Sequence, residues 1–507
     1  MRRLTIVVSA LVVALLIPVQ SASAVDEVNT KRFRQAVTVG GIMSHERALQ
    51  RIANRNGGTR ASGTPGYEAS VEYVEGRLQA AGYETTRQEF TFPFFRETTP
   101  AELQQVSPTP TDYETGTFDY SGSGDVTGTV VPIDIDIPPP AEAGTSDSGC
   151  EPEDFPPASP TEPQVALIQR GFCFFEVKAE NAAAAGYDAV IIFNEGQEGR
   201  QELFIGTLGT PQDIPVVGLS FADASALYTA AQAGPVSVRV FTETEVDLEA
   251  KTWNVTADTP SGNADKVLVV GAHLDSVIEG PGINDNGSGT SLLLEMAEEL
   301  SENNIRVRQK VRFAFWGAEE SGLLGSEHYV ENLSDDELGS IFANLNFDMV
   351  GSPNYVRFVY DGDGSDTELA GPPGSAEIES IFTDYFASQG LASAPTEFSG
   401  RSDYGPFIAV GIPAGGLFTG AEGVKTEEEA EIYGGTAGVA YDVNYHQAGD
   451  TINNVNTKAL FEMGDAAAHT LLTLAKSRTG FFEDGSRMAR KTLAADSFDF
   501  RGSHAVR

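Results

Sequence analysis

Imidazole and carboxylate side chains recur at the ends of apolar segments in the second half of this 507-residue sequence. His273 and Asp275 stand in His-Leu-Asp directly after the apolar run 266–272, and His446 stands in Tyr-His-Gln-Ala-Gly-Asp further along the chain. Imidazole nitrogens and carboxylate oxygens are both good ligands for Zn²⁺. The pattern therefore indicates a metal site and directs attention to other acidic residues placed in the same way.

Three further acidic residues follow an apolar segment, and a fourth, Asp285, stands just before a predicted helix. They are Asp285 within Gly-Ile-Asn-Asp-Asn-Gly-Ser-Gly, Glu319 and Glu320 after Arg-Phe-Ala-Phe-Trp-Gly-Ala, and Asp348 after Asn-Leu-Asn-Phe. Each motif alone is most simply explained as a structural pair or a solvated surface. Together they would bury several charges at one site, which is costly unless a cation neutralises them. Since one carboxylate can bridge two ions through its two oxygens, the set predicts a pair of zinc ions.

The elements that would position these residues alternate between strands and helices. Such alternation is typical of an α/β fold with a largely parallel sheet, and ligands bind such sheets beyond the carboxyl ends of the strands. Strands are predicted at 84–92, 266–272, 310–316, 345–350, 355–361 and 413–418, and helices at 47–54, 66–81, 287–300, 322–332, 375–389 and 457–475. We therefore expect the acidic and imidazole residues to meet at one edge of a sheet.

The first 24 residues have the composition of a secretory signal peptide. Arg2 and Arg3 precede an apolar run, 4–19, which is followed by Ser-Ala-Ser-Ala. A basic end, a short apolar stretch and an Ala-x-Ala exit direct export, whereas the run is short for a membrane anchor and Pro18 interrupts its end. We therefore expect a secreted, extracellular protein.

The charge of the chain excludes several kinds of partner. Lysine and arginine together number 33 and aspartate and glutamate 73, so the formal net charge is −40. Nucleic-acid binding requires a basic surface, and anionic membrane surfaces would repel this protein. We expect neither partner, and we attribute the acidity to solubility.

The sequence contains only two cysteines, Cys150 and Cys173. In an oxidising compartment two thiols this close in sequence are expected to form a disulfide. A catalytic cysteine is not supported, because neither thiol has a histidine near it in the sequence.

A block rich in proline, glycine, serine and threonine separates the two α/β parts of the chain. It contains Leu-Ile-Gln-Arg-Gly-Phe-Cys-Phe at 167–174, Lys178, and Ile-Pro-Val-Val at 214–217. On these residues it resembles the protease-associated (PA) domain, over residues 101–245. The resemblance implies a small α/β module that serves a peptidase as a lid or docking module without chemistry of its own. A generic small α/β insertion is the alternative.

The region 266–475 resembles the secreted bimetallic zinc aminopeptidases, that is, the leucine-preferring bacterial enzymes and their fungal aminopeptidase Y relatives. The similarity rests on the metal-site motifs and extends upstream to Ala-Ser-Gly-Thr-Pro-Gly-Tyr at 61–67. It implies the zinc exopeptidase fold, a mixed and mostly parallel sheet sandwiched by helices. The chain would then comprise a signal peptide (1–24), an N-terminal part of the peptidase domain (25–100), the inserted PA domain (101–245), the catalytic domain (246–477) and a C-terminal tail (478–507).

The resemblance implies that five residues bind two zinc ions per chain. His273 and Asp348 would bind one ion, Glu320 and His446 would bind the other, and Asp285 would bridge the two. Each ion would then have about three protein ligands, and such open coordination is typical of catalytic rather than structural zinc.

The resemblance implies catalytic roles for three more residues. Glu319 would be the general base, and Asp275 would orient the imidazole of His273. Tyr445 would stabilise the oxyanion of the tetrahedral intermediate. A cis peptide is expected between Asp285 and Asn286.

Alignment with the family places Met349, Arg401 and Phe418 around the pocket for the first residue of the substrate. Methionine and phenylalanine linings suit Leu, Met or Phe side chains. Core packing explains Met349 and Phe418 equally well, and Arg401 could simply pair with Asp403.

A calcium site that some relatives have is only partly represented here. Asp465 fits it, but Phe461 stands where a second acid would be needed. The loop with Asp361, Asp363 and Asp366 offers another acidic cluster, although a solvated loop explains it more simply. Calcium therefore remains a candidate cofactor besides zinc.

These inferences converge on a secreted, monomeric zinc aminopeptidase. It would release apolar, leucine-like residues from the amino termini of peptides or proteins through a water activated by two metal ions. A carboxypeptidase on the same scaffold is one alternative, but it would recognise a free carboxylate, usually with several arginines, and only Arg401 stands out. A protein-binding module built on the PA domain, with a metal site that is only structural, is the other alternative.

Overall fold

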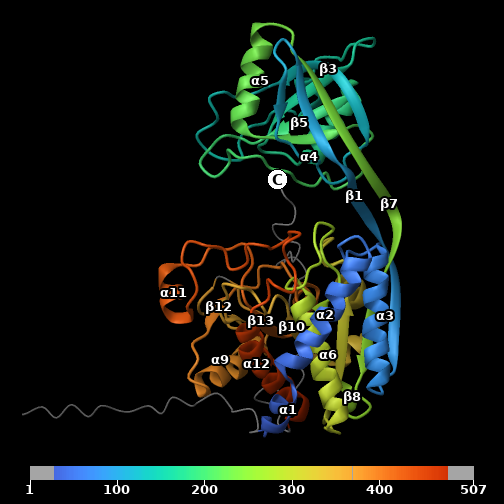
Figure 1. Cartoon of the computed structure of the whole chain (residues 1–507), viewed down its shortest axis with the longest axis vertical. Helices are drawn as coiled ribbons and strands as arrows, with labels where there is room; N and C mark the ends of the chain where they lie inside the picture. Colours follow the sequence, from blue (N-terminus) through green and yellow to red (C-terminus); the bar gives the residue numbers. More distant parts are fainter. Residues whose placement is uncertain (1–27, 368, 478–507) are drawn as a thin grey trace, which may run out of the picture.

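The computed structural model describes residues 28–367 and 369–477 (Figure 1). The predicted signal peptide (1–24) and the C-terminal tail (478–507) lie outside the described residues. The chain forms two bodies, and two long strands run side by side from one body to the other. Within the described part of the chain, no helix combines the length and the apolar character needed to cross a bilayer.

The larger body is built on a sheet whose four central strands are parallel. Strand β8 lies between β9 and β10, and β13 follows β10. Beyond β13, the short strand β11 is antiparallel to it and pairs in turn with the edge strand β12. The strands are β8 (Asn263–His273), β9 (Gln309–Trp316), β10 (Ile341–Phe347), β11 (Phe358–Tyr360), β12 (Ala394–Thr396) and β13 (Ala414–Phe418).

Both faces of this sheet are covered because the central strands are apolar on both sides. In β8, Leu268 and Val270 point into one core, whereas Val267 and Val269 point into the other. One face carries α2 (Val39–Arg55), α3 (Pro65–Ala80), α6 (Gly287–Glu302), α9 (Ser375–Ser388) and α12 (Thr457–Lys476), and the other carries α7 (Leu324–Glu331), α8 (Asp335–Ser340) and α10 (Gly405–Ala409). The predicted fold class, a mixed and mostly parallel sheet sandwiched by helices, is confirmed.

Two smaller helices complete this body, and one predicted helix is longer than expected. Helix α1 (Lys31–Ala36) packs on α12, and α11 (Glu427–Tyr433) lies in the segment before His446. Helix α2 begins eight residues before the predicted helix because Thr38 caps it by accepting a hydrogen bond from the Gly41 amide. Two glycines in its first turn hide this start in the sequence.

The smaller body is the insert, and it is itself a small α/β unit. Strands β3, β4, β5 and β6 are parallel to one another, and β3 is antiparallel to β7. A disulfide joins Cys150 and Cys173 within this body. Its elements are β2 (Thr111–Tyr113), β3 (Gly124–Ile133), the 3₁₀ turn η1 (Pro152–Asp154), β4 (Gln164–Gln169), α4 (Phe175–Ala185), β5 (Ala189–Phe193), β6 (Val216–Leu219) and α5 (Phe221–Ala233).

A two-stranded ribbon connects the bodies. Strands β1 (Thr85–Ser107) and β7 (Ser237–Asp258) pair antiparallel along almost their whole length, and β7 also pairs with β9, so one 13-stranded sheet runs through both bodies. The sequence predicted only the first part of β1 and none of β7. Residues 243–249 alternate four acidic residues with Thr244, Val246 and Leu248, but this stretch is solvated on both faces and has no buried apolar side in the structure.

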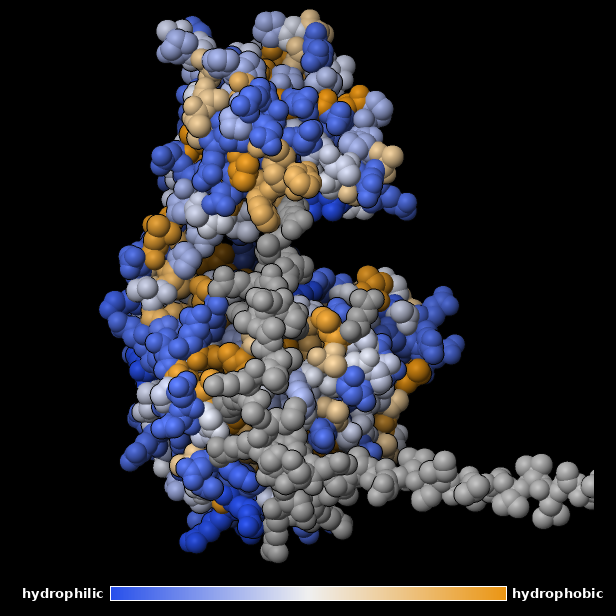
Figure 2. Space-filling view, turned by 180° about the vertical axis from the view of Figure 1, so that it is seen from behind, coloured by the Kyte–Doolittle hydropathy of each residue, from blue (hydrophilic) through white to orange (hydrophobic). Residues whose placement is uncertain are grey.

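The surface of the molecule is mostly hydrophilic, in keeping with its acidic composition (Figure 2). The same view shows a deep notch between the two bodies.

Candidate metal centre

Four of the predicted site residues lie at the carboxyl ends of neighbouring parallel strands. His273 is the last residue of β8, and Asp348 follows the end of β10 directly. Glu319 and Glu320 follow β9, whose residue Trp316 is in register with His273. Because these three strands are adjacent and point the same way, their ends bring the side chains to one edge of the sheet.

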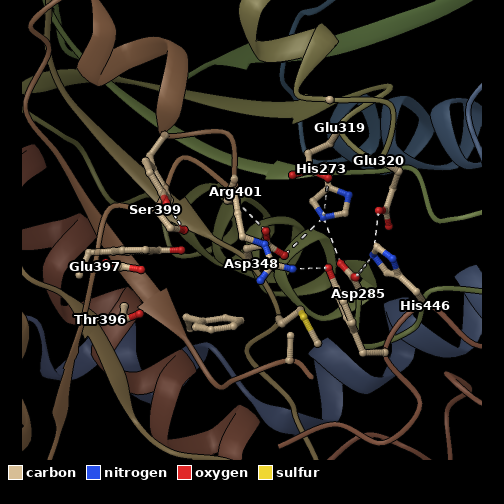
Figure 3. Close-up of a pocket in the computed structure, with 18 residues that line it drawn as sticks. His273, Asp285, Glu319, Glu320, Asp348, Thr396, Glu397, Ser399, Arg401 and His446 are labelled. Atoms are coloured by element: carbon tan, nitrogen blue, oxygen red, sulfur yellow. Dashed lines mark hydrogen bonds and ion pairs between the residues drawn. The ribbon is translucent and has the colours of Figure 1, made fainter. Parts of the chain in front are cut away.

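Asp285 lies between the two histidines. Its Oδ1 atom is 3.2 Å from Nε2 of His273, and its Oδ2 atom is 3.3 Å from Nε2 of His446. A second carboxylate approaches the same nitrogen of each imidazole: Asp348 Oδ1 is 3.3 Å from Nε2 of His273, and Glu320 Oε2 is 3.1 Å from Nε2 of His446. The structure therefore brings together all five residues that the sequence suggested, with one oxygen of Asp285 facing each group (Figure 3).

The segment that carries Asp285 is held by backbone geometry as well. The peptide between Asp285 and Asn286 is cis, as the family resemblance implies. Asn286 caps α6 by accepting a hydrogen bond from the Gly289 amide. Asp285 thus sits just before the positive end of a helix, which favours a negative charge at that place.

Glu319 and Asp275 lie beside His273. Glu319 Oε2 is 3.9 Å from Nε2 of His273, and the Glu319 amide donates a hydrogen bond of 3.3 Å to Oδ1 of Asp275. Asp275 Oδ1 is also 3.6 Å from Nδ1 of His273, the nitrogen that faces away from Asp285. Asp275 is therefore placed to hold both the imidazole ring and the backbone of Glu319.

The clustered carboxylates at this edge of the sheet raise the pKa values of their neighbours, so the site favours binding of positive charge. Burial, together with the neighbouring Asp403 and Glu320 carboxylates, raises the pKa of Glu319 well above its usual range. Burial and then Asp285 raise the pKa of Glu320 to about 7. Burial opposes protonation of His446, but Glu320 and Asp285 raise its pKa to about 11.

The residues present fit zinc on their donor chemistry. Each imidazole nitrogen faces carboxylate oxygens at similar distances, and these are the nitrogen and oxygen donors that zinc accepts. Within the described residues, Oδ1 of Asp348 and Oε1 of Glu320 are buried and accept no hydrogen bond. Buried carboxylate oxygens without donors are costly unless a cation is bound near them.

Two residues that the sequence analysis did not single out hold the loops of the site. Asp450 accepts hydrogen bonds of 2.9 Å from the amides of both Asn284 and Asp285. The buried guanidinium of Arg60 donates to the carbonyls of Pro281 (2.8 Å), Gly282 (2.5 Å) and Leu274. The position of Asp450, four residues after His446 in the same motif, was the only sequence signal for its role.

A third such residue supports Asp348. The hydroxyl of Ser402 donates a hydrogen bond of 2.6 Å to Oδ2 of Asp348, and it accepts one from the amide side chain of Asn346. Ser402 is adjacent to the predicted pocket residue Arg401, but nothing in its spacing indicated contact with the metal ligands.

A pocket of about 140 Å³ opens beside these side chains. The predicted residues Met349, Arg401 and Phe418 all line it, as does Tyr445. Met349 is almost completely buried with a positive φ of 48°, and Phe418 stacks on a neighbouring aromatic ring. The sequence did not identify several other lining residues, among them Tyr360, Thr396, Glu397, Ser399 and Tyr404.

Arg401 does not pair with Asp403, so that alternative is wrong. Its guanidinium donates to Glu422 Oε1 at 2.7 Å and to the hydroxyl of Tyr445 at 3.2 Å. Tyr445 in turn stacks on the ring of His446, with 3.8 Å between the ring centroids. Arg401 therefore orients the tyrosine beside the histidine.

The two candidate calcium clusters already have protein partners. Asp465 accepts hydrogen bonds from Arg34 (2.7 Å) and from the hydroxyl of Tyr385. Asp361 accepts hydrogen bonds from four backbone amides in its own loop. Asp465 is thus stabilised without a cation, whereas oxygens of Asp361, Asp363 and Glu379 lie close enough together to hold one.

Comparison with known proteins agrees with this geometry. Residues 254–471 match the model of Peptidase family M28, and residues 126–227 match that of the PA domain. An aminopeptidase of Pseudomonas aeruginosa is 48% identical over 441 residues, which cover 86% of this chain and 80% of that protein. Leucine aminopeptidase 2 of Trichophyton rubrum is 38% identical over 430 residues, which cover 83% of this chain and 81% of that protein.

Solved structures show the same similarity. The aminopeptidase from Aneurinibacillus sp. strain AM-1 superposes with a TM-score of 0.68 at 25% identity, covering 89% of this chain and 97% of that chain. BSAP, a zinc aminopeptidase from Bacillus subtilis, superposes with a TM-score of 0.62 at 25% identity, covering 89% of this chain and 99% of that chain.

Proposed function

The chain belongs to peptidase family M28, and from this premise we propose that it is a secreted aminopeptidase that uses two zinc ions to release apolar, leucine-like residues from peptides. The relatives establish that the chain is a zinc metallo-aminopeptidase with a PA domain. Our proposal adds the number of ions, the residues that act, the preferred substrate and the location of the enzyme.

The position of Asp285 is the observation that carries the two-metal proposal. Its two oxygens face different imidazoles at nearly equal distances, 3.2 Å and 3.3 Å. We assign His273 and Asp348 to one ion and Glu320 and His446 to the other, with Asp285 shared. When bound, two zinc ions lower the pKa of a water molecule and polarise the scissile carbonyl.

Glu319 is the side chain best placed to move the proton. It is buried at the edge of the ligand cluster, and a carboxylate there accepts a proton from water and later delivers it to the leaving amine. Asp275 keeps His273 in one ring orientation, as carboxylates commonly do for metal-binding imidazoles. Tyr445, held by Arg401, directs its hydroxyl group to stabilise the developing oxyanion.

The charges around the pocket support an amino-terminal rather than a carboxyl-terminal specificity. Glu319 and Asp348 both line the pocket and would attract the free α-ammonium of a substrate. Arg401 is the residue that could bind a substrate carboxylate, but its guanidinium is already paired with Glu422. This pairing disfavours a carboxypeptidase.

Export is supported by the signal-peptide pattern in the first 24 residues and by the disulfide of the insert, since disulfides persist in oxidising compartments. Apolar specificity is supported by Met349 and Phe418 in the pocket. We propose that the secreted enzyme acts as a monomer on peptide and protein amino termini, with zinc and without a need for calcium.

The deciding experiment compares leucine p-nitroanilide with its N-acetylated form. We expect only the free amine to be cleaved, activity to be abolished by a chelator and restored by zinc, and metal analysis to give two zinc ions per chain. Cleavage of the acetylated compound would contradict the aminopeptidase specificity, and full activity with one zinc ion would contradict the two-metal proposal.

A further inference from the structure

A second cluster of metal-binding side chains lies away from the catalytic edge of the sheet. It joins His45 of α2 to Glu295 and Glu298 of α6, two helices that pack side by side in the larger body (Figure 1). One nitrogen or oxygen atom of each residue lies within 4.8 Å of the others, as in the catalytic clusters. Glu295 is about 14 Å along the helix axis from Asn286, so the two sites are separate.

The three side chains are buried, and the gaps between their facing atoms are wider than a hydrogen bond. His45 is 2%, Glu295 5% and Glu298 7% exposed. Nε2 of His45 is 3.6 Å from Oε2 of Glu298 and 3.9 Å from Oε2 of Glu295. A hydrogen bond between nitrogen and oxygen spans about 3.2 Å or less, whereas donors around a tetrahedral zinc ion are about 3.4 Å apart. The spacing therefore suits a shared cation better than a shared proton.

His45 and Glu295 are each oriented by a partner on the side away from this gap. Nδ1 of His45 is 2.7 Å from the hydroxyl of Tyr73, so the other ring nitrogen faces the glutamates. Oε1 of Glu295 accepts hydrogen bonds from both the amide (3.0 Å) and the hydroxyl (3.1 Å) of Thr38, so Oε2 is the oxygen that faces His45. Metal ligands are commonly held in this way by partners behind them.

Gly41 makes the space that the carboxylate of Glu295 occupies. A Cβ atom at this position would lie 1.9 Å from Oε2 of Glu295, so another residue would displace that oxygen from His45. Gly41 lies in the first turn of α2 and does not have a positive φ. Its backbone conformation therefore does not require glycine, whereas the close approach of Glu295 does.

The charges of the cluster also favour a cation. Arg77 donates one hydrogen bond of 2.6 Å to each oxygen of Glu298. Because a carboxylate oxygen has two lone pairs, Oε2 of Glu298 can still bind an ion on the side of His45. Arg77 balances one of the two glutamate charges, so one negative charge remains when His45 is neutral, and a buried charge is costly without a counterion.

We propose that His45, Glu295 and Glu298 form a third zinc site, which joins α2 to α6. Imidazole nitrogen and carboxylate oxygen are the donors that zinc accepts. Since Glu298 shares its charge with Arg77, this site binds zinc less tightly than the catalytic pair and is filled when zinc is added to the dialysed enzyme. The net charge of −40 raises the local concentration of cations.

The test titrates zinc chloride into the dialysed enzyme that retains its catalytic zinc, with isothermal titration calorimetry as the readout. We expect one further zinc ion per chain to bind, and His45→Gln to weaken this binding about tenfold or more, because it removes a ligand. Glu295→Gln, which still offers Thr38 an acceptor, should weaken it as well. Added zinc should raise the Tm of the wild-type enzyme but not that of either variant.

The matched control is His328→Gln, which removes a histidine of α7 that stacks on Phe90 and belongs to neither metal cluster. It should bind the further zinc ion as the wild-type enzyme does. All three variants should cleave leucine p-nitroanilide at the wild-type rate, because they leave the catalytic ligands intact.

Two results would overturn the proposal and leave the aminopeptidase function untouched. One is that the wild-type enzyme binds no further zinc. The other is that His45→Gln and Glu295→Gln bind it with unchanged affinity, which would assign the added zinc to surface carboxylates and the cluster to an ion-pair network with a protonated His45.

Discussion

Two sets of parallel strands in this molecule end in buried polar side chains, one in the insert and one in the larger body. In the insert, the parallel strand β4 ends at the buried Gln169, and its neighbour β5 is followed by the buried Glu195. In the larger body, the parallel strands β8, β9 and β10 end at or are followed by residues of the metal site. The same rule about strand ends therefore applies to both regions, but only one of them has the features of a catalytic site.

The difference lies in how the buried charges are satisfied. In the insert, Glu195 accepts hydrogen bonds from the amides of Gly144 (2.7 Å), Thr145 (3.1 Å) and Ser146 (3.3 Å) and pairs with Arg200 at 3.0 Å. These contacts neutralise the charge of Glu195 and hold the loop at 144–146 in place. A carboxylate satisfied by its own chain has no capacity left for a ligand.

In the larger body the buried carboxylates face one another and two imidazoles instead. Within the described residues, one buried oxygen each of Asp348 (Oδ1) and Glu320 (Oε1) accepts no hydrogen bond. The comparison teaches that unsatisfied, converging charges mark a ligand site, whereas buried charges with internal donors mark structure. Three substitutions test this contrast, each with a different expected loss.

The largest effect is expected for Glu319→Gln. The substitution removes the group that accepts the proton but leaves the assigned zinc ligands intact, so kcat on leucine p-nitroanilide should fall by roughly 10² or more while the zinc content stays at the wild-type level. Steady-state assays measure kcat, and metal analysis measures the zinc content. Near-normal turnover would refute the assignment of Glu319 as the base.

An intermediate effect is expected for Asp450→Asn. Asp450 now accepts hydrogen bonds from two backbone amides. In the variant, the NH₂ group of the asparagine would face one of these amides, so that hydrogen bond would be lost and the loop that carries Asp285 should become less ordered. Residues that support metal ligands in this way typically contribute about 10- to 100-fold to metal affinity or activity. Zinc retention during dialysis against a graded chelator measures the change.

The control for that variant is Asp336→Asn, which alters an exposed aspartate in the first turn of α8. It should retain zinc as the wild-type enzyme does. Equal zinc retention in Asp450→Asn and wild type would show that the hydrogen bonds of Asp450 do not position the metal site.

The smallest effect on catalysis is expected for Glu195→Gln. This change removes a charged acceptor of three backbone amides, so it should destabilise the loop by about 2 kcal/mol. Hydrogen exchange of the amides 144–146 should become faster, while kcat on leucine p-nitroanilide stays within about twofold of wild type. A large loss of activity without faster exchange would place Glu195 in the active site and contradict the contrast between the two regions.

The sequence predicted elements and site residues correctly where a strong local hydrophobic pattern stands next to metal-binding residue types. β8 and α6 were expected close to their observed bounds, because continuous apolar runs and helical spacing are strong local signals. Of the five residues that we assign to zinc, His273, Glu320 and Asp348 end or follow such strands, and Asp285 stands just before α6. His446 lies in a loop without a strand before it and was identified through the family resemblance. The relatives confirm the predicted family, fold class and enzyme class.

Residues that act through tertiary contacts could not be found in this way. Asp450 meets Asn284 across 166 residues, and Arg60 meets Gly282 across 222. Glu397 belongs to no local sequence motif, and it is recognised as a pocket residue only in the structure, where β12 brings it to the pocket. The physical reason is that an isolated charged residue reads as solvated surface until its neighbours in space are known.

The ribbon between the bodies has a consequence for how such a chain could arise. Because Thr85 pairs with Ala257, the polypeptide leaves and re-enters the larger body through neighbouring strands. The ends of the intervening segment are side by side whatever its length, so a long excursion adds little closure entropy to the folding of the larger body. A short hairpin at the same register would meet the same geometric requirement. We therefore expect that evolution can enlarge, exchange or remove the insert without changing the architecture of the larger body.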